Sequence, residues 1–379
     1  MSWKLPVDIA TTAVKSRLSR LNPTNYELCE KAIDLMNLQN DYGDGRDLTI
    51  IDAYPSMGIW SSALNRKLNP SKHILLEPGR SYHKFLESKS GIPAGSEAIK
   101  LVRDDPFRWG TFTELVSQGL YQPTAQNDMS KINPNILFTA NFTHPQGEQL
   151  CAQYLNCMWN HSWLFQYGRV RMLLWVREST AAKMLARPGE RARSRFAVQC
   201  DAVSRIKPRV ISNNTSLKTS IANLNLSTIE RFTTGEDAGQ CLSVEDNLIV
   251  HSEKKKISTS TVTASSSKTG SPVLLQIDPT GINVPHLDCF EFVIRQLFIF
   301  RGKPLRDSLL VLGAGAGDWF PSRLPADLLD KPPKDMEVSH FMTITEVFAK
   351  WPFKPEILHD FYDEQEAGMT AAPYSVNIN

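Results

Sequence analysis

The chain has 379 residues, of which 41% are hydrophobic, and this length suits one large domain followed by a smaller one. Its 42 Lys and Arg nearly balance its 40 Asp and Glu, so the overall charge indicates no particular partner. The sequence holds no run of about 18 apolar residues, which excludes a membrane-spanning helix, and we expect no membrane partner. The six cysteines are scattered without a C-x-x-C pair, a pattern typical of reduced, buried thiols, and we expect no metal site.

The first twenty residues are basic and poor in acids. The basic side chains are Lys4, Lys15, Arg17 and Arg20, against the single acid Asp8. A basic, amphipathic, acid-poor start is typical of a mitochondrial import signal, but an ordinary surface helix has the same pattern. The composition of this segment leaves both interpretations open.

Short apolar runs separated by helix-like stretches recur over the first 280 residues. Strands that alternate with helices indicate βαβ units and a mostly parallel sheet, so we expect a Rossmann-like α/β fold. The expected strands are Leu48–Ala53, His73–Glu77, Ile99–Val102, Ile136–Ala140, Val170–Val176, Phe196–Asp201 and Val273–Asp278.

A polar insertion interrupts this pattern, and helices follow it. Residues 251–271 are rich in Ser, Thr and Lys and cannot bury enough surface to offset the entropy of ordering, so we expect a disordered insertion. The sequence therefore predicts an α/β domain over 1–280, a small all-helical domain over 281–363 and a flexible tail over 364–379. The expected helices of the second domain are Phe290–Phe300, Pro304–Leu312, Phe341–Trp351 and Glu356–Tyr362.

Acidic residues follow three successive expected strands. Asp52 ends the first strand shortly before Gly58, Glu77 closes the second, and Asp105 follows the third. In a doubly wound sheet the loop after the first strand lies under the cofactor; an acid after the second can accept ribose hydroxyls, and one after the third an adenine amine. Each acid alone could be a helix cap, but the ordered set indicates an actual or ancestral nucleoside pocket.

The fourth expected strand runs into Asn141-Phe142-Thr143-His144. An Asn at this position could accept a hydrogen bond from the exocyclic amine of a flipped adenine, and an aromatic side chain close behind it would stack on the base. The alternative is a simple Asn turn at the end of a strand. His144 has no second His or Cys at ligand spacing, which argues against a metal.

The segment from Leu164 to Val210 is strongly basic, with eleven Lys and Arg against three acids. Basic loops beside aromatic side chains suit a groove that follows a nucleic-acid backbone and stacks on unpaired bases, although a solvated loop beside core aromatics is the simpler alternative. The expected nucleic-acid residues are Arg187, Arg191, Arg193 and Arg195, and the nearby aromatics are Trp163, Phe165, Tyr167, Trp175 and Phe196.

Several stretches resemble a known superfamily. LFTANFTHPQGE, LLWVRESTAAKMLARPGERARSRFAV and PVLLQIDP are similar to segments of ribosomal RNA adenine dimethyltransferases. More narrowly, the chain resembles the fungal mitochondrial transcription factor B family in IIDAYPSMGIWS, SYHKFLES, RDDPFRW, FQYGRVRMLLWV, ARPG and KWPFKPEILHDF. The likeness runs from Leu21 to about Tyr362, apart from the insertion.

The resemblance implies a class I S-adenosylmethionine-dependent methyltransferase fold with a small helical C-terminal domain. It implies catalytic positions at Asn141 and Phe142, and a mitochondrial matrix protein, monomeric, whose partners are mitochondrial RNA polymerase, promoter DNA and the unpaired strand. The S-adenosyl-L-methionine site that it implies consists of Leu21, Asp52, Gly58, Glu77, Asp105 and Asn141.

Departures from the dimethyltransferase pattern bear on activity. After Asn141 these enzymes have Leu or Ile, then Pro, then an aromatic residue, whereas this chain has Thr143 and His144 at the last two positions. Loss of base stacking alone costs roughly 1–3 kcal/mol. Tyr54 and Ser56 also stand in the loop before Gly58, where small residues would leave room for a cofactor.

We therefore expect the catalytic and cofactor sites to be vestigial. The leading hypothesis is a transcription initiation factor that confers promoter recognition and melting on mitochondrial RNA polymerase. The alternative is a ribosomal RNA adenine N6,N6-dimethyltransferase that uses S-adenosylmethionine, and a third option is an RNA-binding protein that keeps the fold for structure.

Overall fold

The computed structural model describes residues 3–6, 14, 20–212, 231–232, 235, 237–244, 251–252, 272–282 and 284–356. Residues 253–271 of the expected insertion, the C-terminal tail and most of the last expected helix lie outside these residues, whereas His251 and Ser252, at the start of the expected insertion, form a short strand. The chain divides into two compact units, of which the first comprises Met1–Leu185 with Gln199–Ile282. The second comprises Ala186–Val198 with Asn283–Asn379, so it includes a short segment from the middle of the chain.

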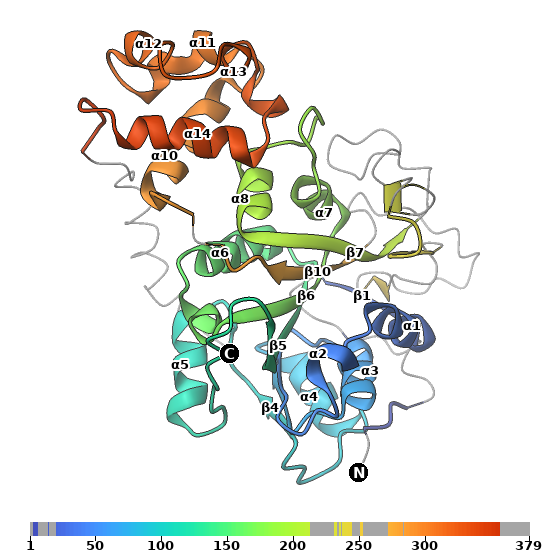
Figure 1. Cartoon of the computed structure of the whole chain (residues 1–379). Coiled ribbons are helices and arrows are strands. Elements are labelled where there is room, and N and C mark those ends of the chain that lie inside the picture. The colour runs from blue at the N-terminus through green and yellow to red at the C-terminus, as the bar shows by residue number, and fades with distance from the viewer. Residues whose placement is uncertain are drawn as a thin grey trace. The chain divides into compact units, whose positions relative to one another are not determined.

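A mostly parallel sheet forms the centre of the first unit. Its strands, together with a separate two-residue ladder of β1 and β9, are β1 (Leu21–Asn22), β2 (Thr49–Ala53), β3 (Lys72–Leu76), β4 (Ile99–Val102), β5 (Ile132–Phe142), β6 (Arg169–Arg177), β7 (Ser204–Ser212), β8 (Leu242–Val244), β9 (His251–Ser252) and β10 (Pro272–Pro279). In the described part of the chain, eight strands lie in the order β4-β3-β2-β5-β6-β10-β7-β8. Strands β5, β6, β10 and β7 are labelled in Figure 1. Strand β10 runs antiparallel to both of its neighbours, β6 and β7.

The apolar runs that predict strands are the buried strands of this sheet. Ile50, Ile74 and Leu174 are fully buried, as expected for strands with helices on both faces. The expected Rossmann-like fold is confirmed, and six of the seven expected strands lie in the sheet.

One expected strand is wrong. Phe196–Asp201 lies within helix α8 (Arg195–Val203), and the strand β7 begins only at Ser204. Ala197, Val198 and Cys200 are buried in this helix, and so short an apolar run looks the same in a buried helix and in a buried strand.

Helices of the first unit follow the strands in alternation. They are α1 (Tyr26–Met36), α2 (Gln39–Tyr42), α3 (Ile59–Leu68), α4 (Arg80–Ser88), α5 (Trp109–Ser117), α6 (Gly147–Trp159), the 3₁₀ turn η2 (Trp163–Tyr167) and α7 (Glu178–Met184). The side chain of Asn25 caps α1 by accepting a hydrogen bond from the Leu28 amide at 3.0 Å. Leu28 and Ala32 of α1 share an apolar cluster with Ile59 and Ala63 of α3.

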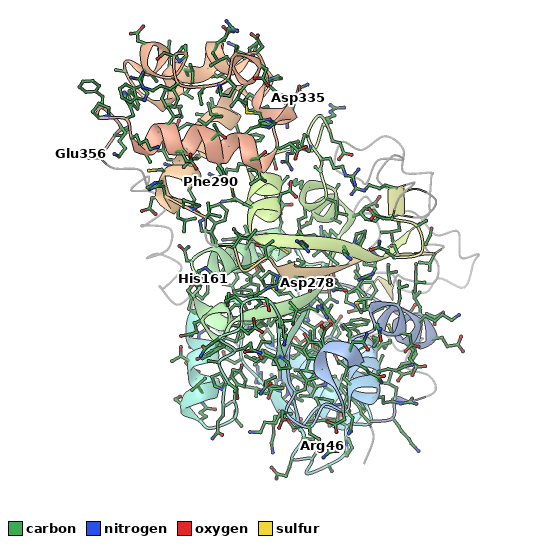
Figure 2. The ribbon with its side chains drawn as sticks, viewed as in Figure 1. Arg46, His161, Asp278, Phe290, Asp335 and Glu356 are labelled. Carbon is green, nitrogen blue, oxygen red and sulfur yellow. The ribbon has the colours of Figure 1, made fainter. Side chains whose placement is uncertain are left out.

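The second unit is helical. Its elements are α10 (Leu287–Leu297), η5 (Phe298–Phe300), α11 (Leu305–Ser308), η6 (Leu309–Leu312), α12 (Ala316–Trp319), α13 (Ala326–Leu329), η7 (Pro333–Asp335) and α14 (Val338–Ala349). Helices α10 and α14 pack together through stacked rings, with the centroids of Phe292 and Phe348 5.2 Å apart. Phe290, labelled in Figure 2, is fully buried in this core. Among the described residues, no helix has the length and apolar character needed to cross a membrane.

Candidate functional site at the switch point of the sheet

The predicted site residues meet where the strand order reverses. Strands β2 and β5 pair in parallel, with Ala53 opposite Ala140, although the chain between them forms β3 and β4. Ligands of open α/β sheets bind at the carboxyl ends of the strands at such a switch point. The loop after β2, Glu77 after β3, Asp105 after β4 and Asn141 near the end of β5 all lie at this edge.

The loop after β2 keeps a backbone suited to glycine. Tyr54, Ser56 and Gly58 have φ angles of 58°, 57° and 78°, in the left-handed region that glycine adopts without a steric penalty. The two non-glycine residues each cost about 1–3 kcal/mol of strain, which the surrounding structure must offset. The loop therefore keeps the backbone conformation of a cofactor-binding loop, but it carries the side chains of Tyr54 and Ser56 where small residues would leave room for a ligand.

The N-terminal segment lies directly against this loop. A Cβ atom on Gly58 would lie 2.8 Å from the ring of Trp3, so the indole occupies the space beside the glycine. Trp3 is fully buried, and its Nε1 donates a hydrogen bond to the Ser90 carbonyl at 2.9 Å. Trp3 is thus part of the core of the first unit.

The carboxylate of Glu77 is occupied by groups of the protein itself. Arg20 donates to it twice, from Nη1 to Oε2 at 2.7 Å and from Nη2 to Oε1 at 2.8 Å. The amides of Ser56 and Gly79 also donate to it, at 3.2 and 2.8 Å. An ionised carboxylate offers about four acceptor positions, so none remains for the hydroxyls of a ribose.

Arg20 is held from several sides. Its Nη1 also donates to Ser56 Oγ at 3.0 Å, and its guanidinium carbon lies 5.2 and 4.7 Å from the ring centroids of Tyr54 and Tyr82. Both Arg20 and Glu77 have fully buried side chains. The basic pattern of the N-terminus does not distinguish Arg20 from the exposed Lys4, and no signal in the sequence links it to an acid 57 residues away.

Tyr54 binds the carboxylate that the sequence predicts as the acceptor of an adenine amine, that of Asp105. Its hydroxyl donates to Asp105 Oδ1 at 2.6 Å, and the amide of Phe107 donates to the same oxygen at 3.0 Å. The Tyr54 ring packs edge-to-face on His144, with centroids 4.9 Å apart. Burial, together with the neighbouring Asp105, raises the pKa of Tyr54 above its ordinary value, so the phenol stays protonated.

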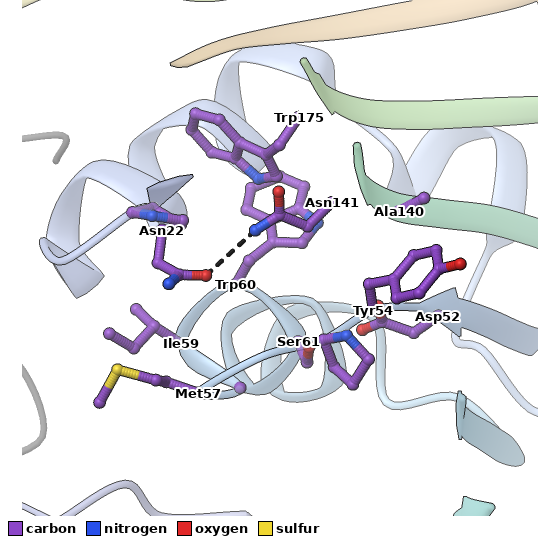
Figure 3. Close-up of a pocket in the computed structure, with 13 residues that line it drawn as sticks. Asn22, Asp52, Tyr54, Met57, Ile59, Trp60, Ser61, Ala140, Asn141 and Trp175 are labelled. Carbon is purple, nitrogen blue, oxygen red and sulfur yellow. Dashed lines mark hydrogen bonds between the residues drawn. The ribbon is translucent and has the colours of Figure 1, made fainter. Parts of the chain in front are cut away.

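The Asn141 amide is also fully used. Its Nδ2 donates to the Leu21 carbonyl at 2.9 Å and to Asn22 Oδ1 at 3.1 Å, the second of which is drawn in Figure 3. Its Oδ1 accepts from the amide and the hydroxyl of Thr143, at 3.2 and 2.6 Å. The predicted cofactor residues Leu21 and Asn141 are therefore neighbours, but they hydrogen-bond to each other and leave the Asn141 amide without a free group for a ligand.

The remaining predicted positions at this edge are buried. Phe142 is 1% exposed, and Asp52 lies 3.3 Å from His73 Nε2, with burial raising its pKa. His144 is 2% exposed, and neither of its ring nitrogens has a hydrogen-bond partner in the described part of the chain. Burial, with Arg20 and Arg177 nearby, lowers the pKa of His144 to about 3, so the imidazole is neutral. A narrow pocket remains, lined by Asn22, Met57, Trp60, Asn141 and Trp175 among others (Figure 3).

The four predicted nucleic-acid arginines belong to the second unit and differ in burial. Arg193 is fully buried and donates to the carbonyls of Ala186 and Met336, at 2.8 and 3.3 Å. It therefore ties the segment to the helical core. Arg187, Arg191 and Arg195 are exposed and remain candidates for contact with a ligand.

The aromatic side chains that the sequence offers for base stacking lie largely in the core. Trp175 and Phe165 are buried, and Trp163 is half-buried and stacked on Tyr154 with centroids 4.3 Å apart. Trp109, which begins α5, is an exposed aromatic side chain outside this predicted set, with 51% of its surface exposed. Its only sequence signal is its place in the stretch RDDPFRW, which closely follows the third strand.

The order of the described strands in the sheet, with β10 antiparallel to its neighbours, and the loop geometry at the switch point define a protein with the S-adenosylmethionine-dependent methyltransferase fold. The chain belongs to the ribosomal RNA adenine dimethylase family, whose model matches residues 15–349.

Within this family, its relatives include proteins named mitochondrial transcription factor 1. The one from Saccharomyces cerevisiae is 33% identical over 346 residues, which are 90% of this chain and 91% of that protein. The one from Lachancea kluyveri is 29% identical over 365 residues, 96% of this chain and 98% of that protein. The resemblance drawn from the sequence is confirmed, and so is the expectation of a mitochondrial protein.

Two methyltransferases are among the solved structures with a similar chain trace. The 23S rRNA methyltransferase ErmE matches with a TM-score of 0.46 and 12% identity, over 84% of this chain and 97% of that chain. A dimethyladenosine transferase from Plasmodium falciparum matches with a TM-score of 0.45 and 11% identity, over 84% and 95%.

Proposed function

We propose that this protein is a transcription initiation factor of the mitochondrial matrix that confers promoter recognition and melting on mitochondrial RNA polymerase. It acts as a monomer and transfers no methyl group. The name shared by its relatives, mitochondrial transcription factor 1, supports the first part. The buried Arg20–Glu77 pair is the observation that supports the second.

The ion pair argues against S-adenosylmethionine in the present arrangement. Ribose hydroxyls would have to replace a bidentate guanidinium on Glu77, and each neutral hydrogen bond contributes only about 0.5–1.5 kcal/mol. Separating a buried ion pair and leaving one charge unpaired costs about 3–5 kcal/mol. The exchange is therefore unfavourable, and the residues present do not fit the cofactor that the fold implies.

The groups that would act on an adenine are also committed elsewhere. The oxygen of Asn141 that would accept the target amine already accepts two hydrogen bonds from Thr143. His144, at the position of the stacking aromatic residue, is buried against Tyr54 and presents no exposed ring. A flipped base would find neither its acceptor nor its stacking partner, so the positions Asn141 and Phe142 are vestigial.

Exposed groups are available for nucleic acid instead. Arg187, Arg191 and Arg195 are exposed and would contact phosphates, and the exposed Trp109 would stack on an unpaired base. Opening a duplex costs roughly 1.4 kcal/mol per stacked step, and stacking of a base on an aromatic side chain returns about 1–3 kcal/mol. Binding of a few unpaired bases can therefore offset the opening of a short bubble. Because Phe142 is buried, this role falls to Trp109 rather than to the ancestral base pocket.

Two assays on the purified full chain test this proposal. The first measures binding of S-adenosylmethionine by equilibrium dialysis and methyl transfer to an adenine-containing ribosomal hairpin; we expect neither. Labelled adenine in the hairpin would instead establish the alternative, a ribosomal RNA adenine dimethyltransferase.

The second assay measures run-off transcription from a linear mitochondrial promoter with the polymerase, with and without this protein. We expect transcripts with the correct start only when the protein is present. Trp109→Ala removes the exposed ring and should lower open-complex formation about 5–150-fold, the equivalent of 1–3 kcal/mol. Trp109→Phe keeps a stacking ring and should retain most of the activity. Equal activity of both variants would contradict the role of Trp109.

A further inference from the structure

Three segments far apart in the sequence form one basic surface on the helical unit. The amide of Gly189 donates to the Lys334 carbonyl at 2.9 Å, and the amide of Lys334 donates to the Arg301 carbonyl at 3.0 Å. The Arg301 side chain returns to the first segment, donating from Nη1 to the carbonyls of Arg193 and Arg191 at 3.0 and 3.3 Å. These bonds fix the segments 187–195, 301–303 and 331–335 against each other.

We call this surface the basic platform and define it by its cationic side chains. Arg191, Arg195, Arg301 and Lys303 are exposed, and Lys334 is half-buried. In the part of the chain that the structure describes, none of these five has a carboxylate partner within ion-pair distance. The nearby Arg306, in contrast, is paired with Asp330. The same segments also carry the acids Glu190 and Asp335, but the five cations outnumber them, so the platform has a net positive charge.

Two features hold the charges in place. The buried Arg193 fixes the first segment from below through the carbonyls of Ala186 and Met336. The ammonium of Lys303 lies over the ring of Phe300, 4.6 Å from its centroid, in a cation–π contact that limits its rotamers. The platform thus presents cations in fixed positions instead of on a freely moving loop.

We propose that the basic platform binds the phosphate backbone of duplex DNA without reading its sequence. This inference rests on the proposed function, and it adds Arg301, Lys303 and Lys334 to the arginines that the sequence indicates. A phosphate backbone offers regularly spaced anions that need no apolar contact. Protein interfaces typically have an apolar core depleted in charged residues, whereas the platform is defined by cationic side chains, which makes a protein partner the weaker fit.

The salt dependence of binding is the property that tests this proposal. Each phosphate neutralised contributes about −0.9 to the slope of log K against log salt concentration. The triple variant Arg191→Ala, Lys303→Ala and Lys334→Ala removes three such contacts, so its slope should be less steep by about 2.7. These three side chains carry none of the hydrogen bonds described above, since the loops are held by main-chain groups, Arg193 and Arg301.

The experiment measures anisotropy of a labelled promoter duplex, and of a shuffled duplex of equal composition, over a range of salt concentrations. The full chain, the triple variant and the control Lys350→Ala are compared after their melting temperatures are shown to match. Lys350 is exposed on the same unit but lies outside the platform. We expect the triple variant to lose affinity and slope equally for both duplexes, and the control to behave like the full chain.

Three outcomes would overturn the proposal. One is an unchanged slope in the triple variant, and another is a loss confined to the promoter sequence. The third is normal DNA binding with weakened binding to the polymerase, which would make the platform a protein interface. Failure of the unmodified chain to support promoter-specific transcription would refute the proposed function instead. The DNA-binding measurements need no polymerase, so they test the platform separately from the proposed function.

Discussion

Removal of the Arg20 side chain should destabilise the first unit far more than removal of an exposed arginine. Arg20→Ala eliminates two hydrogen bonds to Glu77, one to Ser56 Oγ and the contacts with the rings of Tyr54 and Tyr82. Hydrogen bonds to charged groups contribute about 1.5–3 kcal/mol each, and part of this is returned because the guanidinium no longer has to be buried. Loss of one partner of a buried pair accordingly costs about 3–5 kcal/mol.

Scanning calorimetry measures this cost as a shift in melting temperature. For a unit of this size 1 kcal/mol corresponds to roughly 2–4 °C, so we expect a decrease of about 6–20 °C. Arg46→Ala is the matched control, because Arg46 pairs with Asp44 at a highly exposed position, and its melting temperature should not change.

A double-mutant cycle separates the ion pair from simple loss of packing. If Arg20 and Glu77 bind each other, Arg20→Ala combined with Glu77→Ala should be less destabilising than the sum of the single changes by about 2–3 kcal/mol. Additive effects, or an Arg20→Ala variant that melts like Arg46→Ala, would refute the argument that this pair occupies the cofactor site.

Three further predictions concern stability. Trp3→Ala removes a fully buried indole beside Gly58 and should cost about 3–5 kcal/mol in chemical denaturation, whereas Lys4→Ala, at an exposed position, should cost almost nothing. His144 has a pKa of about 3 in the fold against about 6.5 when unfolded, so protonation of the unfolded chain should reduce stability by about 2 kcal/mol as the pH falls from 7.5 to 5. In thermal melts at both pH values, His144→Phe should lose that part of the acid sensitivity; an unchanged pH dependence would contradict a buried neutral imidazole. Arg193→Ala should lower the stability of the helical unit by about 3 kcal/mol in urea unfolding, while Arg191→Ala should leave it unchanged, and the reverse ranking would show that Arg193 is not the buried tie.

The sheet could be predicted from the sequence because its strands are buried on both faces. Runs such as Leu48–Ala53 and Val170–Val176 are mostly apolar, and this pattern is typical of a buried strand or a buried helix. The same ambiguity accounts for the error at Phe196–Asp201, where the run is helical. The length of the run could not distinguish a strand from a helix, because α8 has only 9 residues and is about as long as a strand.

The site could be predicted in part. The positions of Glu77, Asp105 and Asn141 follow from their places at strand ends, since the carboxyl ends of parallel strands meet at one edge. What these side chains bind could not be predicted, because Arg20 and Tyr54 reach them through tertiary contacts. Only the first segment of the basic platform could be predicted from the sequence, because Arg301 and Lys334 lie more than a hundred residues beyond Arg191.

The most direct test of the central claim compares run-off transcription from a closed duplex promoter with transcription from the same promoter carrying a short mismatched bubble at the start site. If the protein supplies the free energy of melting, the polymerase should need it on the closed duplex and much less on the opened one. Equal dependence on the two templates, or accurate initiation on the closed duplex without the protein, would contradict the account.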